Sequence, residues 1–335
     1  MKFSLIICTY QRPEALLKLL KSVQLQNLYP DQILVIDGSH DTSTGEALNP
    51  KEFPNLNYFK VDERERGLTK QRNYGIQKVA ETSEIVCFLD DDIVLTPEYF
   101  QNLISTYSQH PDALGVGGAI IDEVQWRKLN PGETPIFSEF SLDGYVRKDS
   151  SRFMLRKKLG LLGNSFPTFM PEEGHGRSVG FLPPSNKIYK VETFMGGVAS
   201  YRKTVFKQLK FSTYFEGYGL YEDTDFTLRC SKIGNLYVNT SAKLYHYHDE
   251  DGRPNQFKYG KMVVRNGWYV WRVRHKNPSF KAKTNWHLIT WLLILIRFSN
   301  VFNTSNSKQA FSEGMGRTFG WISLIFSKPK VSIND

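Results

Sequence analysis

The chain has 335 residues, of which 40% are hydrophobic and 23% charged, as expected for a globular protein with a sizeable core. Its formal net charge of +9 indicates an acidic partner and leaves nucleic acid, phosphorylated ligands and an anionic membrane surface open. The three cysteines are widely spaced and form no CxxC pair. This argues against a zinc site and fits reduced thiols in a cytoplasmic protein.

Apolar, β-branched runs predict four buried strands in the first part of the chain: residues 3–9, 32–36, 57–61 and 84–89. Helices are predicted between and after them, beginning at Pro13, at Gly67 and at the segment Thr96-Pro97-Glu98. The apolar run at residues 3–9 is too short for a signal peptide and lacks a cleavage site, so we interpret it as the strand that begins the fold.

This alternation predicts an α/β fold of the Rossmann-like kind, with a mainly parallel sheet and helices on both of its faces. Right-handed crossovers place the carboxyl ends of parallel strands at the same edge of such a sheet. The polar residues that follow the strands are therefore expected to converge on one crevice: Thr9-Tyr10, Asp37, and Asp90 to Asp92.

Later parts of the chain are less regular. Residues 122–190 lose periodicity, and such a long stretch in a compact domain indicates a functional insertion or disorder. Beyond it, helices are predicted at residues 203–209 and 222–233, with short strands at 236–238 and 243–245. We place a boundary near Asp251, where the chain becomes basic and aromatic and then apolar.

Three adjacent carboxylates, Asp90-Asp91-Asp92, directly follow a predicted strand. They repel one another unless a cation or hydrogen-bond donors compensate. In an extended chain Asp90 and Asp92 point to the same side, an arrangement that suits a hard divalent cation bridging to phosphate oxygens. The alternative is a solvated acidic turn that caps the next helix. An EF-hand is excluded because the loop glycine and the terminal glutamate are missing.

Two helix starts and a pair of histidines offer further chemistry. Gly67 to Asn73 begins a helix with two cations, which suits phosphate, although an amphipathic helix with a solvated basic face remains an alternative. Tyr221 to Asp225 places three acids at a helix start, where one carboxylate has the chemistry to remove a proton from an acceptor hydroxyl, or the acids serve as simple caps. His246 and His248 follow a short strand and are candidate metal ligands.

Taken together and in this order, these segments resemble the family 2 glycosyltransferases, which adopt the GT-A fold and invert the anomeric centre. The resemblance runs from Phe3 to about His248. It is carried by six segments: residues 6–13 (IICTYQRP), 35–39 (VIDGS), 67–73 (GLTKQRN), 88–92 (FLDDD), 196–202 (GGVASYR) and 219–226 (GLYEDTDF).

The resemblance implies roles for individual residues on the donor side. Thr9, Tyr10 and Arg12 would line the nucleotide pocket, and Asp37 would contact the base. Arg72 and Asn73 would lie near the ribose and diphosphate, where Asp90 and Asp91 also contact the donor.

It also implies a metal site and an acceptor side. Asp90 and Asp92 would be the family's DxD pair, with Asp92 the direct ligand of Mg²⁺ or Mn²⁺. His246, or alternatively His248, would complete the site. Asp223 would be the general base, and Gly196, Gly197 and Glu222 would lie on the acceptor side.

The expected activity is metal-assisted, single-displacement transfer of a sugar from a UDP-, GDP- or dTDP-sugar to a glycan or lipid-linked saccharide. The expected domains are a GT-A domain at residues 1–250, with residues 122–190 as an acceptor-side insertion, and a helical extension at residues 251–335. The enzyme alternative is a nucleotidyltransferase that makes sugar nucleotides, but residues 8–13 contain no glycine-rich phosphate loop. A non-catalytic, transferase-like binding protein is a second alternative, and a nucleic-acid binder is disfavoured because no such motif is present.

The C-terminal part suggests contact with a membrane. Cations from Lys258 to Lys283 would attract anionic lipid, and the interleaved aromatics Trp268, Tyr269, Trp271 and Trp286 would sit at headgroup level. The apolar run at residues 286–296 is shorter than the roughly 20 residues that a spanning helix needs. We therefore expect a cytoplasmic protein that is peripheral at the inner face of the plasma membrane. The alternative is a helical cap whose apolar residues pack on the protein.

Overall fold

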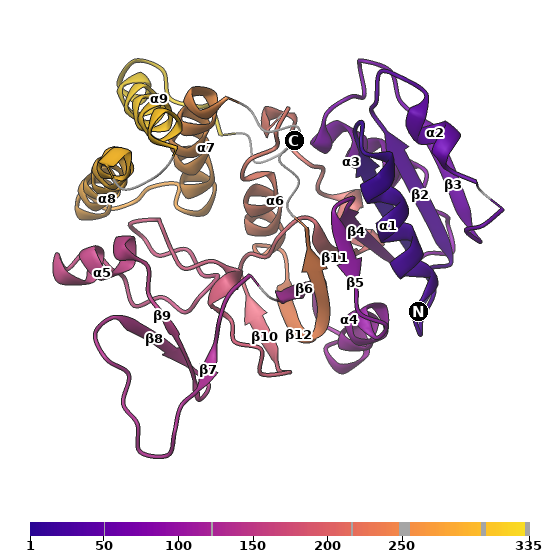
Figure 1. Cartoon of the computed structure of the whole chain (residues 1–335), viewed down its shortest axis with the longest axis horizontal. Coiled ribbons are helices and arrows are strands. Elements are labelled where there is room, and N and C mark those ends of the chain that lie inside the picture. The colour runs from indigo at the N-terminus through magenta and orange to yellow at the C-terminus, as the bar shows by residue number, and fades with distance from the viewer. Residues whose placement is uncertain (50, 122, 216, 248–254, 303–305, 332–335) are drawn as a thin grey trace. The chain divides into compact units, whose positions relative to one another are not determined.

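The computed structural model describes residues 1–49, 51–121, 123–215, 217–247, 255–302 and 306–331. The chain divides into two compact units (Figure 1). Unit 1 takes Met1–Val124 and Pro184–Asp251, and unit 2 takes Gln125–Pro183 and Gly252–Ile333. Most of the stretch predicted as irregular therefore belongs to the same unit as the C-terminal helices. The division into a transferase domain at 1–250 and an extension at 251–335 stays a prediction.

Unit 1 is built on one mixed sheet, which within the described residues has nine strands. Four parallel strands form one half: β1 (Phe3–Thr9), β2 (Gln32–Asp37), β3 (Leu56–Lys60) and β4 (Ile85–Asp90). The other half comprises β5 (Ile93–Leu95), β6 (Ala113–Ile121), β10 (Ile188–Val191), β11 (Val198–Arg202) and β12 (Asn235–His246). β11 runs antiparallel to both β4 and β6 and so joins the two halves.

The register of the parallel strands brings their polar ends to one edge. Thr9 lies opposite Asp37 in the β1–β2 ladder, and Cys8 lies opposite Asp90 in the β1–β4 ladder. The predicted α/β class and the convergence of these strand ends are therefore confirmed.

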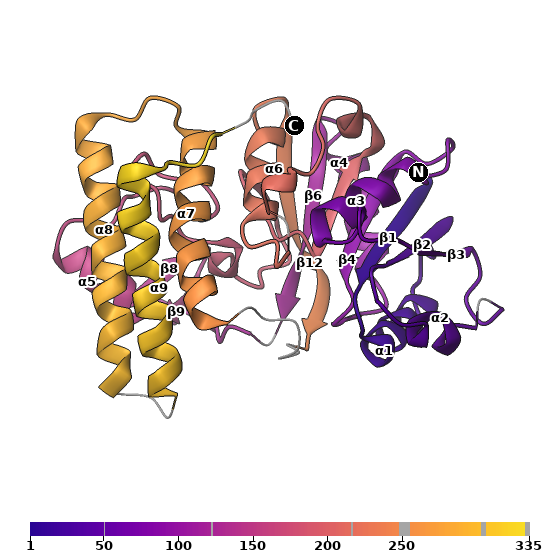
Figure 2. The same cartoon turned by 90° about the horizontal axis from the view of Figure 1, so that it is seen from above.

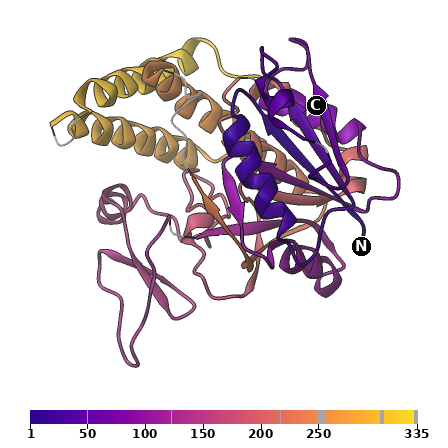
Figure 3. The ribbon, with the colours of Figure 1, turned by 45° about the vertical axis from the view of Figure 1, so that its right-hand side comes forward.

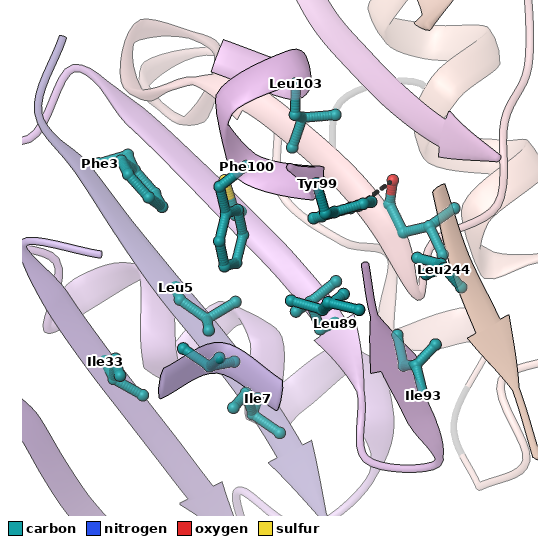
Figure 4. Packing of buried hydrophobic residues seen from close by; sticks show 14 of the residues in the cluster. Phe3, Leu5, Ile7, Ile33, Leu89, Ile93, Tyr99, Phe100, Leu103 and Leu244 are labelled. Atoms are coloured by element: carbon teal, nitrogen blue, oxygen red, sulfur yellow. Dashed lines mark hydrogen bonds between the residues drawn. The ribbon is translucent and has the colours of Figure 1, made fainter. Parts of the chain in front are cut away.

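Apolar helix faces cover this sheet. The helices of unit 1 are α1 (Pro13–Gln24), α2 (Ser43–Ala47), α3 (Leu68–Gln77), α4 (Tyr99–Gln109) and α6 (Glu222–Cys230), with 3-10 turns η2 (Lys203–Lys207) and η3 (Thr213–Phe215). Figure 3 shows α1, in indigo, lying across the strands. In Figure 4, Phe100 of α4 lies beside Phe3 of β1 and next to Tyr99, and all three side chains are almost fully buried.

Several local predictions need correction. The two short strands expected at residues 236–238 and 243–245 form one strand, β12, with a register shift against β6 between Val238 and Lys243. The helix expected at residues 203–209 is only the 3-10 turn η2. The helix expected to begin at Thr96-Pro97-Glu98 begins at Tyr99 as α4, and the Thr96 hydroxyl donates to the carbonyl oxygen of Lys243 at 2.8 Å.

Unit 2 combines a small sheet with helices. Its strands are β7 (Arg127–Lys128), β8 (Glu139–Leu142) and β9 (Tyr145–Lys148), followed by α5 (Ser151–Lys158) and the 3-10 turn η1 (Val179–Phe181). The C-terminal part forms α7 (Gln256–Arg274), α8 (Phe280–Ser299), the 3-10 turn η4 (Asn300–Phe302) and α9 (Ser307–Phe326). Figure 2 shows α7, α8 and α9 as rods lying side by side. No helix in the described part of the chain is both long and apolar enough to cross a membrane.

The aromatic side chains expected at a membrane surface are buried instead, and Trp268, Trp271 and Trp286 form one cluster in unit 2. Trp268, Tyr269, Trp271 and Trp286 are at most 6% exposed. Trp271 and Trp286 stack with ring centroids 5.4 Å apart. That part of the membrane prediction is wrong. Alternating cations and aromatics in α7 reflect one buried and one solvated helix face, a pattern that sequence alone does not distinguish from an interfacial helix.

Candidate active site

The three consecutive aspartates lie where β4 ends and the chain turns into β5, and each has its own partner. Asp90 faces Arg72, whose Nη2 lies 3.3 Å from Asp90 Oδ1. Asp91 faces Thr9 and Arg12, and Asp92 faces Arg12 and His246. The acids are therefore not a solvated turn, because partners from four other segments of unit 1 surround them.

Asp91 is the inward member of the cluster. Its Oδ2 accepts a hydrogen bond from Thr9 Oγ1 at 2.7 Å, and its Oδ1 lies 3.4 Å from Arg12 Nη1. Burial raises the pKa of Asp91 to about 6, against the opposing effects of Thr9 and Arg12. Arg12 also lies 3.6 Å from Asp92 Oδ2, so it ties the helix start after β1 to two acids of the cluster.

Asp92, His246 and Glu123 form a line of contacts. Asp92 Oδ1 is buried, lies 3.2 Å from His246 Nε2 and has no hydrogen bond of good geometry. On the other side of the ring, His246 Nδ1 lies 3.0 Å from Glu123 Oε1. The nearby carboxylates of Asp92 and Glu123 raise the pKa of His246 to about 10. Although burial disfavours its charge, the pKa of Asp92 is lowered by His246 and then by Arg12.

This line of side chains offers some of the ligands that a divalent cation needs. Within the described residues, no group of three His, Cys, Asp or Glu side chains is arranged to hold a metal ion. Asp92 and His246 nevertheless supply a carboxylate and an imidazole, which suit manganese, and Asp92 Oδ1 is buried without a hydrogen bond. Glu123 holds the second ring nitrogen, as carboxylates do behind metal-binding histidines. The donor set fits, and the role of Asp90 as a ligand stays a prediction. His248 lies outside the described residues.

A second network joins Arg72 to both sides of the site. Arg72 is 2% exposed and pairs with Glu222 as well as with Asp90. Burial raises the pKa of Glu222 to about 8, while Arg72 opposes that shift. An arginine this deeply buried is stable only with charged partners, so it fixes α3, β4 and α6 against one another.

Gly196 and Gly197 leave the room that this network occupies. A Cβ on Gly196 would lie 2.5 Å from Glu222 Oε1 and 2.7 Å from Arg72 Nη1, and a Cβ on Gly197 would overlap the Asp90 carboxylate. The two glycines thus allow charged side chains to approach the backbone that leads into β11.

Asp223 begins α6 beside this network. Its Oδ1 accepts hydrogen bonds from the backbone N–H of Thr224 at 2.6 Å and from the Thr224 hydroxyl at 3.2 Å. Its Oδ2 accepts a long bond from the N–H of Gly196 at 3.4 Å. Asp225, by contrast, is fully buried and binds Arg229 through Oδ2 at 2.6 and 3.0 Å. Asp225 is thus held in a buried ion pair, whereas Asp223 is only partly buried and its Oδ2 has one long contact.

The remaining predicted donor residues have their own partners outside these two networks. Asp37 accepts hydrogen bonds from the N–H of Ser39 at 2.7 Å and from the Tyr58 hydroxyl at 2.6 Å. Tyr10 is 40% exposed and packs edge-on against His40.

Asn73 is engaged with the backbone of Phe211, to which its side chain both donates, at 2.8 Å, and accepts, at 3.0 Å. Its role in donor binding stays a prediction, and its observed contact is structural.

Sequence reasoning missed Glu123 and Gln71. Glu123 lies in the stretch without periodicity. Its position just after a long apolar strand was the signal that the sequence offered. Gln71 is buried and donates to the carbonyl oxygens of Thr9 at 3.1 Å and Ile36 at 2.8 Å, which ties α3 to the ends of β1 and β2. A glutamine on an otherwise basic helix start was the available signal.

Comparison with known sequences defines the class of the protein. The sequence model of glycosyl transferase family 2 matches residues 4–171, half of the chain. The chain belongs to this family.

Particular relatives are more distant. The chain is 29% identical over 131 residues to the glucosyl-dolichyl phosphate glucuronosyltransferase of Haloferax volcanii, a match that covers 38% of this chain and 41% of that protein. It is 30% identical over 126 residues to the amylovoran biosynthesis glycosyltransferase AmsE of Erwinia amylovora, covering 36% of this chain and 46% of AmsE. The chain thus matches less than half the length of these relatives.

A solved structure supports the fold. The mannosyltransferase PcManGT from Pyrobaculum calidifontis, determined with GDP-Man and Mn²⁺, superposes with a TM-score of 0.52 at 14% identity. The superposition covers 98% of this chain and 76% of that one. This likeness shows a GT-A fold.

Proposed function

We propose that the protein transfers a sugar from a nucleotide-activated donor to an acceptor hydroxyl in one displacement that inverts the anomeric centre. Membership of glycosyl transferase family 2 supports the reaction class. The observation that carries the proposal is the position of Asp223, at the first turn of α6 and beside the network of Arg72, Glu222 and Asp90.

Asp223 is the general base in this proposal. Its Oδ2, held only by the long contact to Gly196, takes the proton of the acceptor hydroxyl as that oxygen bonds to the anomeric carbon. The bond between the anomeric carbon and the donor diphosphate breaks in the same step, and the nucleoside diphosphate leaves. Two bonds to Thr224 orient the carboxylate so that one oxygen faces the acceptor.

A divalent cation, Mg²⁺ or Mn²⁺, is the proposed cofactor, held by Asp92 and His246 with Asp90 assisting. When bound, it supplies positive charge that stabilises the departing diphosphate. Glu123 keeps His246 oriented toward Asp92, and Arg12 holds Asp91 and Asp92 in place. These contacts prepare the ligands before the donor arrives.

The proposed donor is a UDP-, GDP- or dTDP-sugar, and the proposed acceptor is a glycan or a lipid-linked saccharide. GDP-Man bound to PcManGT supports the donor class. The name of the Haloferax relative, which refers to a glucosyl-dolichyl phosphate, supports a lipid-linked acceptor.

The test is a screen of purified protein against nucleotide sugars with Mn²⁺, followed by transfer assays with the donor that binds. Asp223→Asn keeps the size of the side chain but not its basicity, so turnover is expected to fall at least about 10²-fold while donor affinity is retained. Glu222→Gln makes the same acid-to-amide change at the neighbouring residue and serves for comparison. Normal turnover by Asp223→Asn would reject Asp223 as the base, and a product with retained anomeric configuration would reject single displacement.

A further inference from the structure

The outer side of α8 exposes large apolar residues. Leu288 is 50% exposed, Trp291 is 36% exposed and Leu295 is 58% exposed. Their spacing of three and four residues places them on one face of the helix. The opposite face carries Trp286, Ile289 and Ile294, all buried. α8 is therefore apolar on both sides, and the side with Leu288, Trp291 and Leu295 is the more exposed one.

α9 shows the same arrangement. Phe311 is 53% exposed, Phe319 is 51% exposed and Ile322 is 40% exposed. Steps of eight and three residues keep them on one face. Another face packs closely against α7, where a Cβ on Gly320 would lie 3.0 Å from the carbonyl oxygen of Lys261. Phe311, Phe319 and Ile322 keep large exposed fractions on another face of α9, although the Phe319 ring also contacts Phe257 of α7, with ring centroids 5.6 Å apart.

The two exposed faces adjoin. The Phe298 and Phe311 ring centroids are 5.9 Å apart, and those of Trp291 and Trp321 are 4.9 Å apart. These contacts also show that α8 and α9 run antiparallel, as in Figure 2. We define the apolar face as six side chains: Leu288, Trp291, Leu295, Phe311, Phe319 and Ile322. Patches of this kind on folded proteins mark sites of interaction.

The charge around the apolar face is one-sided. Residues 256–330 contain thirteen lysines and arginines and one acid, Glu313. Glu313 is 5% exposed and pairs with Arg297 and Arg317, so it does not offset the outer charge. Because α8 and α9 are antiparallel, the lysines that begin α8 and those that follow α9 lie toward the same end; all four are exposed: Lys281, Lys283, Lys328 and Lys330.

We propose that the apolar face docks on an anionic lipid surface, with α8 and α9 lying in the plane of the headgroups. Apolar side chains enter the boundary of the acyl chains while the lysines contact lipid phosphates. Charge favours this occupant over a second copy of the chain, because a copy would bring the same cations into the contact. The inference does not depend on the proposed transfer reaction, and it rests on other residues than the buried tryptophans of α7 and α8.

The test is flotation of the full chain with vesicles of phosphatidylcholine, or of equal parts phosphatidylcholine and phosphatidylglycerol. The chain is expected to float with the anionic vesicles and less so as salt rises, because salt screens the attraction. The double variant Leu288→Asp/Leu295→Asp should bind at least about tenfold more weakly. Lys281→Glu/Lys283→Glu should lose about tenfold and much of the salt dependence.

The matched control is Leu25→Asp/Leu159→Asp, which makes the same change at leucines that are 72% and 55% exposed elsewhere. It should bind like the parent chain. Circular dichroism checks that each variant is folded. Absence of binding to anionic vesicles at low salt, or equal binding by the two leucine variants, would overturn the proposal. So would a dimer that forms without lipid and is lost in Leu288→Asp/Leu295→Asp, because the face would then belong to a second copy.

Discussion

The acidic cluster of unit 1 and the helices of unit 2 distribute charge and apolar surface in opposite ways. In unit 1, charged groups are drawn inward: Arg72, Glu222 and Asp91 are at most 6% exposed, and each has an oppositely charged partner. In unit 2, large apolar groups are left outside, as with Leu295 at 58% exposed and Phe319 at 51%. Both arrangements cost stability relative to an ordinary core and surface. In our proposals the buried charges serve a polar ligand and the exposed apolar face serves an apolar one.

The largest effect is expected from Asp92→Ala, which tests the role of the buried charges of unit 1. If the inward charges of unit 1 exist to hold a cation, removal of this carboxylate should abolish metal-dependent turnover and most metal-dependent donor binding. Donor binding is measured by calorimetry with and without Mn²⁺. Full activity of the parent in excess EDTA would show that the cluster serves another purpose.

Unit 2 can be examined through two tryptophans of the same helix. Trp286 is 1% exposed and Trp291 is 36% exposed. Trp286→Ala should lower the free energy of unfolding by about 3–5 kcal/mol, because it opens a cavity in the aromatic core. Trp291→Ala should cost less than about 1 kcal/mol and weaken vesicle binding instead. Chemical denaturation measures the free energy of unfolding of both variants. Similar losses in the two variants would show that the two faces of α8 are equally packed.

Glu123→Gln sharpens the account of unit 1. The amide still reaches His246 but carries no charge. It should therefore hold the imidazole ring of His246 less firmly and stabilise that ring less. Metal affinity should fall by roughly 10–100-fold, the usual effect of altering a residue behind a ligand. Titration with Mn²⁺ followed by calorimetry measures this. A change in kcat with unaltered metal affinity would place Glu123 in another role.

A pH dependence of the stability of unit 2 is also expected. Burial lowers the pKa of His175 to about 3, and its ring lies beside Trp286. Between pH 6.5 and 3 the unfolded chain then holds a proton that the folded chain does not. Stability should therefore fall on acidification, by at most about 1.4 kcal/mol per pH unit from this group.

His175→Gln should flatten that part of the stability curve. Tryptophan fluorescence during urea unfolding at pH 4, 5 and 6 is a suitable readout. An unchanged slope would mean that His175 is already protonated in the fold.

The sequence allowed more of unit 1 to be predicted than of unit 2. Continuous apolar strands and Pro13 mark elements whose neighbours follow from right-handed crossovers, so the meeting of Thr9, Asp37 and Asp90 was predictable. The partner of each acid was not predictable from sequence, because the pairing of Arg72 with Glu222 joins segments 150 residues apart. In unit 2, helical spacing alone does not say which of two apolar faces is covered. Trp286 and Trp291 look alike in sequence and differ only through tertiary packing.

The aromatic core of unit 2 has a consequence for cutting the chain. The indole N–H of Trp271 donates to the carbonyl oxygen of Glu172 at 2.7 Å, across 99 residues of sequence. Between those two residues the chain leaves unit 2, adds three strands and α6 to unit 1, and returns. A single cut near residue 251 would therefore leave neither unit complete. The C-terminal fragment would lack the Glu172 carbonyl that Trp271 binds. The N-terminal fragment would keep residues 125–183 without the helices of their own unit. Neither unit can therefore be exchanged whole by a single crossover.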